Sequence, residues 1–170
     1  LKEEITKAMQ MLAEDERVIF IGQNVYYPGH VVYETLGGIP ADKKIELPVA
    51  EALQMGISTG LALSGYIPVT IYPRIDFLLL AADQLVNHLD KLYEMSRGQL
   101  NPKVIIRTMI GNTSPLHPGP QHSGQHAPAF RLLLKHTKVY EIHAIPEVLP
   151  TYTAALHEEG SVLIVESPYR

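Results

Sequence analysis

Six short strand-like runs, separated by segments of helical periodicity, constrain the fold of this chain more than any other feature. The runs cover residues 18–21, 45–47, 68–72, 104–107, 138–142 and 162–165. Helical patterns lie between them, at residues 1–13, 47–65, 76–97, 127–135 and 146–159. Short, largely apolar runs are typical of strands covered on both faces, which occur in parallel sheets. The alternation therefore predicts an α/β fold: a mostly parallel sheet with helices on both faces.

Length and composition exclude several classes of protein. We expect residues 1–170 to form one domain, because 170 residues bury a core of ordinary size. A net charge of -4 gives no basic surface for nucleic acid, and the absence of cysteine excludes thiolate metal sites. No apolar run is long enough for a membrane span. We expect a cytoplasmic protein, or a mitochondrial matrix protein in a eukaryote.

Residues 47–65 contain a single ionisable side chain, Glu51, in an apolar and small-residue segment. Such an acid has two explanations. It is either a solvated carboxylate favoured by a helix N-terminus, or a sheltered carboxyl that holds a proton near neutral pH. Ligands of parallel sheets bind beyond the carboxyl ends of the strands. Glu51 follows the strand-like run at 45–47, so the second explanation would place it in a ligand site.

Several segments, in this order, resemble the pyrimidine-binding domain of thiamine-diphosphate enzymes. The similarity is greatest to the beta subunits of the decarboxylating components of 2-oxoacid dehydrogenases, of pyruvate, branched-chain and acetoin type. The segments that carry it are LPVAEALQMGISTGLALSGYIPV, DFLLLAADQLVNHLDKLYEMSRGQ and GPQHS, together with IGQNV near the start and VLIVESP at the end. The resemblance covers essentially the whole chain and implies a transketolase-like fold.

The resemblance implies three site residues. Glu51 would hydrogen-bond the aminopyrimidine ring of thiamine diphosphate and activate the cofactor, and Phe77 would stack on that ring. His122, within PGPQHS, would face the substrate. Without the resemblance, the simpler interpretations are favoured: Phe77 as an ordinary core residue and His122 as a residue of a surface loop.

The resemblance also implies a partner. Thiamine enzymes hold the diphosphate through magnesium and a Gly-Asp-Gly motif, which this chain lacks. An alpha-type subunit would supply that Mg²⁺ site in a hetero-oligomer of α2β2 type, with a lipoyl domain as acyl acceptor and a small 2-oxoacid as substrate. The alternatives are a split transketolase-type or simple decarboxylase subunit, and a non-catalytic assembly or regulatory relative.

Three departures from the family pattern are visible. The family has a carboxylate pair where this chain has Gln23 and Asn24, and amides do not relay protons as carboxylates do. Gly124 follows Gln-His-Ser in place of the usual glutamine. Family members continue into a second domain, which we expect to be lost, separately encoded or outside this sequence.

Other residues allow simpler interpretations. Gly56 and Gly60 share a helix face, which packs either on the sheet of this chain or on another subunit. The histidines 117, 122 and 126 raise the alternative of a metal site, although their spacing matches no ligand signature.

Polar residues of the 76–97 pattern have simple explanations as well. Asp83, Asn87, Asp90 and Lys91 recur at helical spacing, which predicts a polar helix face. Arg74 and Asp76 follow a strand, and we expect their side chains to be exposed rather than to line the site.

Overall fold

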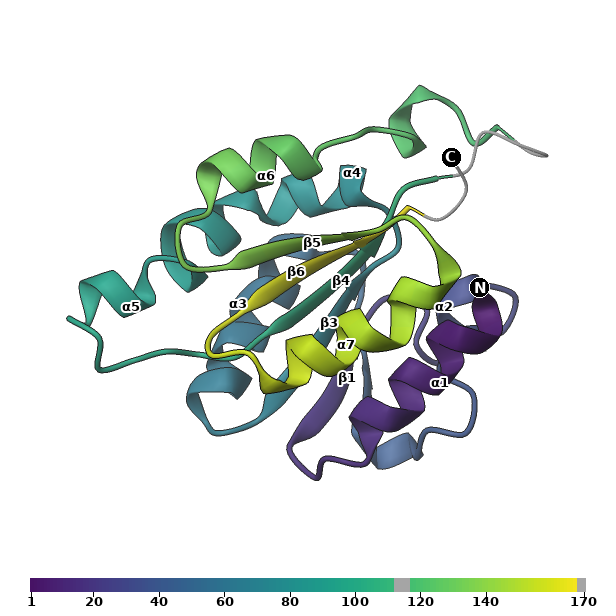
Figure 1. Ribbon diagram of the computed structural model, residues 1–170, viewed down its shortest axis with the longest axis horizontal. Coiled ribbons are helices and arrows are strands. Elements are labelled where there is room, and N and C mark those ends of the chain that lie inside the picture. The colour runs from purple at the N-terminus through teal and green to yellow at the C-terminus, as the bar shows by residue number, and fades with distance from the viewer. Residues whose placement is uncertain (112–116, 168–170) are drawn as a thin grey trace.

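Six parallel strands form one sheet in the computed structural model, which describes residues 1–111 and 117–167 (Figure 1). In spatial order these are β2 (Lys44–Glu46), β1 (Val18–Gly22), β3 (Ile67–Tyr72), β4 (Ile105–Met109), β6 (Val162–Glu166) and β5 (Lys138–Ile142). All neighbouring pairs are parallel. Each strand lies within two residues of its predicted position. The predicted fold class is confirmed.

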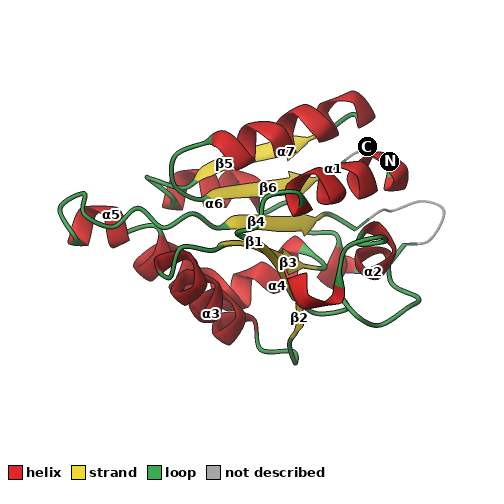
Figure 2. Cartoon of the chain, turned by 90° about the horizontal axis from the view of Figure 1, so that it is seen from below, coloured by secondary structure: helices red, strands yellow, loops and turns green. Residues whose placement is uncertain are grey.

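Helices cover both faces of the sheet, as Figures 1 and 2 show. One face carries α1 (Lys2–Ala13), α2 (Val31–Thr35) and α7 (Val148–His157). The other carries α3 (Glu51–Leu63), α4 (Ile75–Leu78) and α6 (Ala127–Leu133). Each face has its own apolar core, in which all residues of β3, β4 and β6 are buried. In the described part of the chain, no helix is both long and apolar enough to cross a membrane.

The segment between β1 and β2 is more regular than predicted. The sequence shows no strand-like or helical pattern between residues 22 and 38, but α2 forms within this segment. The side chain of His30 accepts a hydrogen bond from the backbone N–H of Val32 at 3.1 Å and so caps the first turn. Thr35, on the same short helix, is fully buried. Tertiary packing and a histidine cap, which is an uncommon cap residue, explain why local sequence gave no helical signal.

The predicted helix at residues 76–97 is wrong as a single element. The chain passes through α4, a 3-10 turn at Leu79–Ala81, a π-helix at Gln84–Leu89 and then α5 (Leu92–Met95). Hydrophobic spacing does not distinguish these related helical forms, since all of them bring apolar residues to one side. The last piece projects from one end of the molecule (Figure 1).

Asp90 explains the wide turn that precedes α5. We expected it on a polar helix face, and that expectation is wrong: Asp90 is 2% exposed. Its carboxylate accepts the backbone N–H groups of Lys135, His136 and Thr137 at 2.7–3.0 Å. The backbone N–H of Asp90 itself bonds to the carbonyl of Leu85, five residues earlier, as in a π-helix. The remaining residues of that predicted face behave as expected, since Asn87 bridges Asp83 and Lys91.

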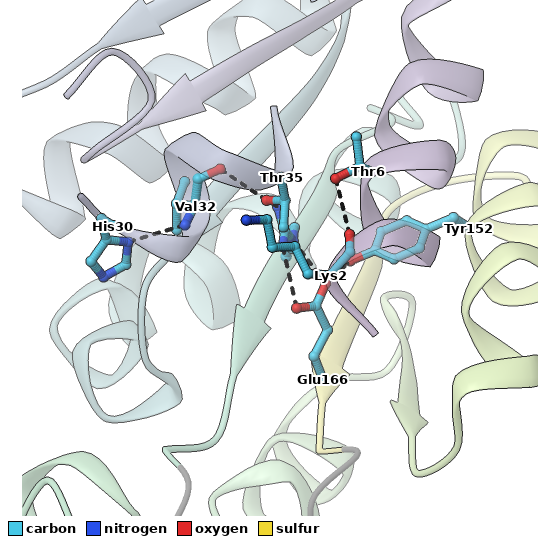
Figure 3. Close-up of polar contacts among 8 residues, drawn as sticks. Lys2, Thr6, His30, Val32, Thr35, Tyr152 and Glu166 are labelled. Atoms are coloured by element: carbon cyan, nitrogen blue, oxygen red, sulfur yellow. Dashed lines mark hydrogen bonds and ion pairs between the residues drawn. The ribbon is translucent and has the colours of Figure 1, made fainter. Parts of the chain in front are cut away.

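A charged network lies inside the core between the sheet, α2 and α7. Arg107, on β4, is fully buried, and its Nε donates to the carboxylate of Glu166 on β6 at 2.8 Å. The hydroxyl of Tyr152 donates to the same carboxylate at 2.6 Å, and Arg107 also donates to Thr35 at 3.0 Å. Figure 3 shows Thr35, Tyr152 and Glu166 converging from three different elements. The network therefore connects strands β4 and β6 to the two helices α2 and α7 that cover them.

Candidate functional site

Glu51 lies at the carboxyl edge of the sheet, as its place in the sequence predicted. Helix α3 begins at this residue, four positions later than the predicted start at 47. The preceding segment instead continues from β2, with the N–H of Leu47 bonded to the carbonyl of Gly22. Glu51 is 6% exposed, and its backbone carbonyl accepts a hydrogen bond from the hydroxyl of Tyr72 at 3.2 Å. Burial raises the pKa of the Tyr72 hydroxyl well above its usual value. The tyrosine therefore remains a donor to the first turn of α3.

The side-chain amide of Gln23, the residue that follows β1, contacts this glutamate. The side-chain nitrogen of Gln23 lies 3.5 Å from Oε1 of Glu51, a long hydrogen bond between two buried side chains. Gly22, immediately before it, has no room for a side chain, because a Cβ there would lie 2.5 Å from the carbonyl oxygen of Ile71. The close approach of β1 to β3 thus fixes where Gln23 leaves the sheet.

Glu46 holds the turn that follows Gln23 and was not identified from the sequence. Its carboxylate accepts the backbone N–H groups of Asn24, Val25 and Tyr26 at 2.7–2.9 Å. Asn24 has a positive φ of 61°, a conformation that asparagine adopts more readily than most residues. Glu46 is the last residue of a strand, so its position at the carboxyl edge was the available signal.

Phe77 and His122, which come from segments 45 residues apart, are in contact. Their ring centroids lie 5.5 Å apart with an interplanar angle of 88°, an edge-to-face arrangement. Phe77 belongs to α4 and His122 to a short 3-10 turn, Pro120–His122. Nδ1 of His122 is buried and has no hydrogen-bond partner among the described residues. Buried polar atoms without partners are unusual in proteins, so this atom is available to a group outside the described residues.

Arg74 and Asp76 are less exposed than we expected. The Asp76 side chain is 12% exposed, and Oδ2 is buried without a hydrogen-bond partner among the described residues. Arg74 is half-buried, and burial lowers its pKa while the charge of Asp76 opposes that effect. Both residues follow β3, next to the pair formed by Phe77 and His122. Together they add polar groups of both signs to the carboxyl edge.

The histidines near position 120 have separate roles. Nδ1 of His117 accepts the backbone N–H of Gly119 at 2.9 Å, while Nε2 of His126 lies 3.3 Å from Asp76. Across residues 1–111 and 117–167, no three histidine or carboxylate side chains come close enough to hold a metal ion.

Exposed apolar side chains lie just before α3, in its first turn and in the 3-10 turn after α4, which packs against α3. We define this apolar surface by Val49, Leu53, Leu79 and Leu80, which are 46–78% exposed. A Cβ added at Gly60, which lies on α3, would meet no described atom within 4 Å beyond its own stretch of helix. Of the two interpretations of the Gly56 and Gly60 face, packing against the sheet of this chain is therefore wrong for Gly60. Exposed apolar side chains gathered in one region are typical of an interaction surface.

No family model matches the sequence. Among curated proteins, the chain is 37% identical over 99 residues to the 3-methyl-2-oxobutanoate dehydrogenase subunit beta of Mycobacterium tuberculosis, which is 56% of this chain and 28% of that protein. It is 26% identical over 162 residues to the mitochondrial pyruvate dehydrogenase E1 component subunit beta of Drosophila melanogaster, covering 92% of this chain and 43% of the relative. The chain thus spans less than half the length of these relatives.

Among solved structures, the chain matches a split-gene transketolase described as an inactive beta4 tetramer. The TM-score is 0.70 at 17% sequence identity, over 96% of this chain and 49% of the other. The structural match shows a shared fold. The sequence matches show that this chain is related to the beta subunits named above. The chain is therefore related in sequence to proteins named as beta subunits of 2-oxoacid dehydrogenases, and it shares its fold with a chain of a split-gene transketolase.

Proposed function

We propose that this chain supplies the pyrimidine side of a thiamine-diphosphate site in a 2-oxoacid dehydrogenase, as a beta-type subunit of its decarboxylating component. The observation that carries the proposal is Glu51: a carboxyl that is 6% exposed, at the carboxyl edge of a parallel sheet, with a long 3.5 Å contact to a neutral amide. A buried carboxyl is costly unless it is paired or used. Gln23 offers one hydrogen bond and no charge, so most of the bonding capacity of Glu51 is left for a ligand.

In this proposal, three residues at this edge would hold the aminopyrimidine and face the substrate. Glu51 would hydrogen-bond a ring nitrogen and hold or release a proton at that atom. Phe77 would offer a flat apolar face to the ring. His122, whose ring is in edge-to-face contact with Phe77, would face the substrate through Nδ1, which has no hydrogen-bond partner among the described residues. Bound thiamine diphosphate supplies the electron sink that decarboxylation of a 2-oxoacid requires.

The partner in this proposal is an alpha-type subunit. It would hold the diphosphate and Mg²⁺, because the sequence lacks the Gly-Asp-Gly motif. We assign the apolar surface of Val49, Leu53, Leu79 and Leu80 to that contact, with Gly60 allowing a close approach of the partner backbone. Both relatives carry the word beta in their names, which supports a second kind of chain in the complex. A lipoyl domain would be the acyl acceptor.

The Glu51→Gln variant tests the function in the complex reconstituted with its alpha-type subunit. The amide keeps the shape of the side chain but cannot exchange a proton, so turnover of 2-oxoacids is expected to fall about 10²–10⁴-fold. Binding of thiamine diphosphate, followed by titration calorimetry, should weaken far less. Glu34→Gln, which alters an exposed pair with Lys2, is the matched control and should leave turnover unchanged.

The same assay separates the alternatives. Unchanged turnover in Glu51→Gln would contradict the proposed role of this acid. Activity with ketose phosphates, or with 2-oxoacids without a lipoyl acceptor, would assign the chain to a transketolase-type or simple decarboxylase complex. Saturable binding to the alpha-type chain without any turnover would indicate an assembly partner.

A further inference from the structure

The segment that carries His122 is held by two contacts. One is made by the backbone of His122 itself, and the other by the backbone of Gly124. On the β4 side, the backbone N–H of Gly111 donates to the carbonyl of His122 at 3.1 Å. A Cβ at Gly111 would overlap that carbonyl, so the two backbones approach as closely as glycine allows. This contact fixes the backbone at His122 but leaves the following residues to be fixed elsewhere.

Asp76 provides the second point. Its Oδ1 accepts the backbone N–H of Gly124 at 3.1 Å and lies 3.3 Å from Nε2 of His126. The side chain of Asp76 is 12% exposed and that of His126 is 33% exposed, so both contacts are largely shielded from water. Hydrogen bonds to a shielded carboxylate are stronger than those between neutral groups.

Gly124 makes this arrangement possible. A Cβ at that position would overlap both Oδ1 of Asp76 and the ring of His126. The lack of a side chain at 124 is therefore linked to the pair of Asp76 and His126. A residue with a side chain would have to displace one of them.

Asp76 is also adjacent to Phe77 in α4. One short segment thus presents the ring that contacts His122 and the carboxylate that holds the end of the His122 loop. We propose that Asp76 is a positioning residue, which sets the place of the His122 ring through Gly124 and His126. The consequence for catalysis rests on the proposed function, whereas the placement of the ring does not.

Substitutions of Asp76 separate its acceptor role from its charge. Asp76→Leu removes the acceptor, whereas Asp76→Asn keeps an oxygen for the Gly124 N–H. In Asp76→Leu, the His122 ring resonances should lose the shift caused by the Phe77 ring. Amide hydrogen exchange at residues 119–126 should rise at least about tenfold, as for a locally opened segment. Asp76→Asn should stay close to wild type in both measurements.

Gly124→Ala should reproduce the effects of Asp76→Leu, because the added Cβ would overlap Asp76 and His126 and so disrupt the same contacts. Two matched controls should change neither measurement. Asp83→Asn alters another Asp–His pair, with His88 at 3.5 Å, on an exposed surface. Gly37→Ala adds a Cβ that would make only ordinary contact with the carbonyl of Glu34, 3.5 Å away.

Steady-state kinetics test whether the placement of His122 affects catalysis. In the reconstituted complex, Asp76→Leu and Gly124→Ala should lower kcat/KM about 10- to 100-fold, since a misplacement of about 1 Å costs that much. Asp76→Asn should restore most of the activity. Wild-type His122 resonances and exchange rates in both Asp76→Leu and Gly124→Ala would overturn the proposal, as would an Asp76→Asn variant as perturbed as Asp76→Leu.

The magnetic resonance and exchange measurements need no cofactor. Altered resonances in a protein without thiamine-dependent activity would therefore support the positioning role and contradict the proposed function alone.

Discussion

Arg107 and Glu166 form an ion pair between neighbouring strands at 2.8 Å, with 0% and 3% of their side chains exposed. Each charge depends on the other, because an ion taken out of water is stable only when paired and hydrogen-bonded. Glu166→Gln is expected to lower the free energy of unfolding by about 3–5 kcal/mol, since it leaves the guanidinium uncompensated. Urea unfolding measures the loss.

The control for this pair is an exposed one. Glu4→Gln removes the charge that pairs with Lys7 on the surface of α1, where water and salt screen such pairs, so it should lower the free energy of unfolding least. Tyr152→Phe should fall between the two, at about 1.5–3 kcal/mol, because it removes one hydrogen bond to a charged group. If Glu166→Gln lowers the free energy of unfolding no more than Glu4→Gln does, Arg107 and Glu166 do not depend on each other as stated.

His30 makes stability depend on pH near neutrality. Burial lowers its pKa first, and the charges of Arg74 and Arg107 lower it further. The unfolded chain therefore binds a proton more readily than the folded one, and stability is lost as pH falls below about 6.5 toward the folded pKa. His30→Asn keeps a capping acceptor for the Val32 N–H but does not titrate.

The measurement is the urea midpoint of both proteins at pH 7.5 and pH 5.5. The wild type should lose more stability than His30→Asn over this interval, because the other histidines contribute equally to both. Equal losses would show that His30 titrates alike in the folded and unfolded chains.

Asp90 anchors the end of α6 to the segment before α5. Asp90→Ala removes the acceptor for three backbone N–H groups, at residues 135–137. The free energy of unfolding should fall by at least about 2 kcal/mol, and amide exchange at these residues should accelerate. Asp90→Asn retains one oxygen and should lie between Asp90→Ala and wild type. Unchanged protection at Thr137 in Asp90→Ala would rule out this anchoring role.

Gln23 places a neutral side chain next to Glu51, where an acid would interact directly with the carboxyl of Glu51. Gln23→Glu would bring a second carboxyl to a position 3.5 Å from the first, and two carboxylates that close do not both ionise freely. One folded-state pKa is then raised above its unfolded value, so the variant should lose stability relative to wild type as pH rises from about 4 to about 7. Gln23→Met, which introduces no charge, should show a pH-independent difference. If the stability of both variants depends on pH in the same way, the new carboxyl is solvated and does not interact with Glu51.

The strands were predictable because burial on both faces leaves an apolar run in the sequence, as in residues 162–165. The glutamate position was predictable for a similar reason, since a single acid stands out in an apolar segment. Phe77 and His122 became candidates only through the resemblance to a family. Their contact depends on a loop whose path is set by distant residues.

The acids that sequence reasoning misplaced or missed have one property in common. Glu46, Asp76 and Asp90 all use a carboxylate to accept backbone N–H groups from segments 20–48 residues away. Helical spacing or a strand end predicts an exposed acid at such positions, because the partner is a backbone group that carries no sequence signature. Long-range acceptance of this kind becomes visible only in three dimensions.

Gly111 and Gly124 carry no chemical group, yet each meets a neighbour so closely that one added carbon atom has no space. A survey of random substitutions would rank both among the most sensitive positions in the protein. Such a ranking, taken by itself, would assign them to the reacting centre. Their intolerance comes from crowding, and a functional map of this loop has to separate the residues that react from those that merely leave room.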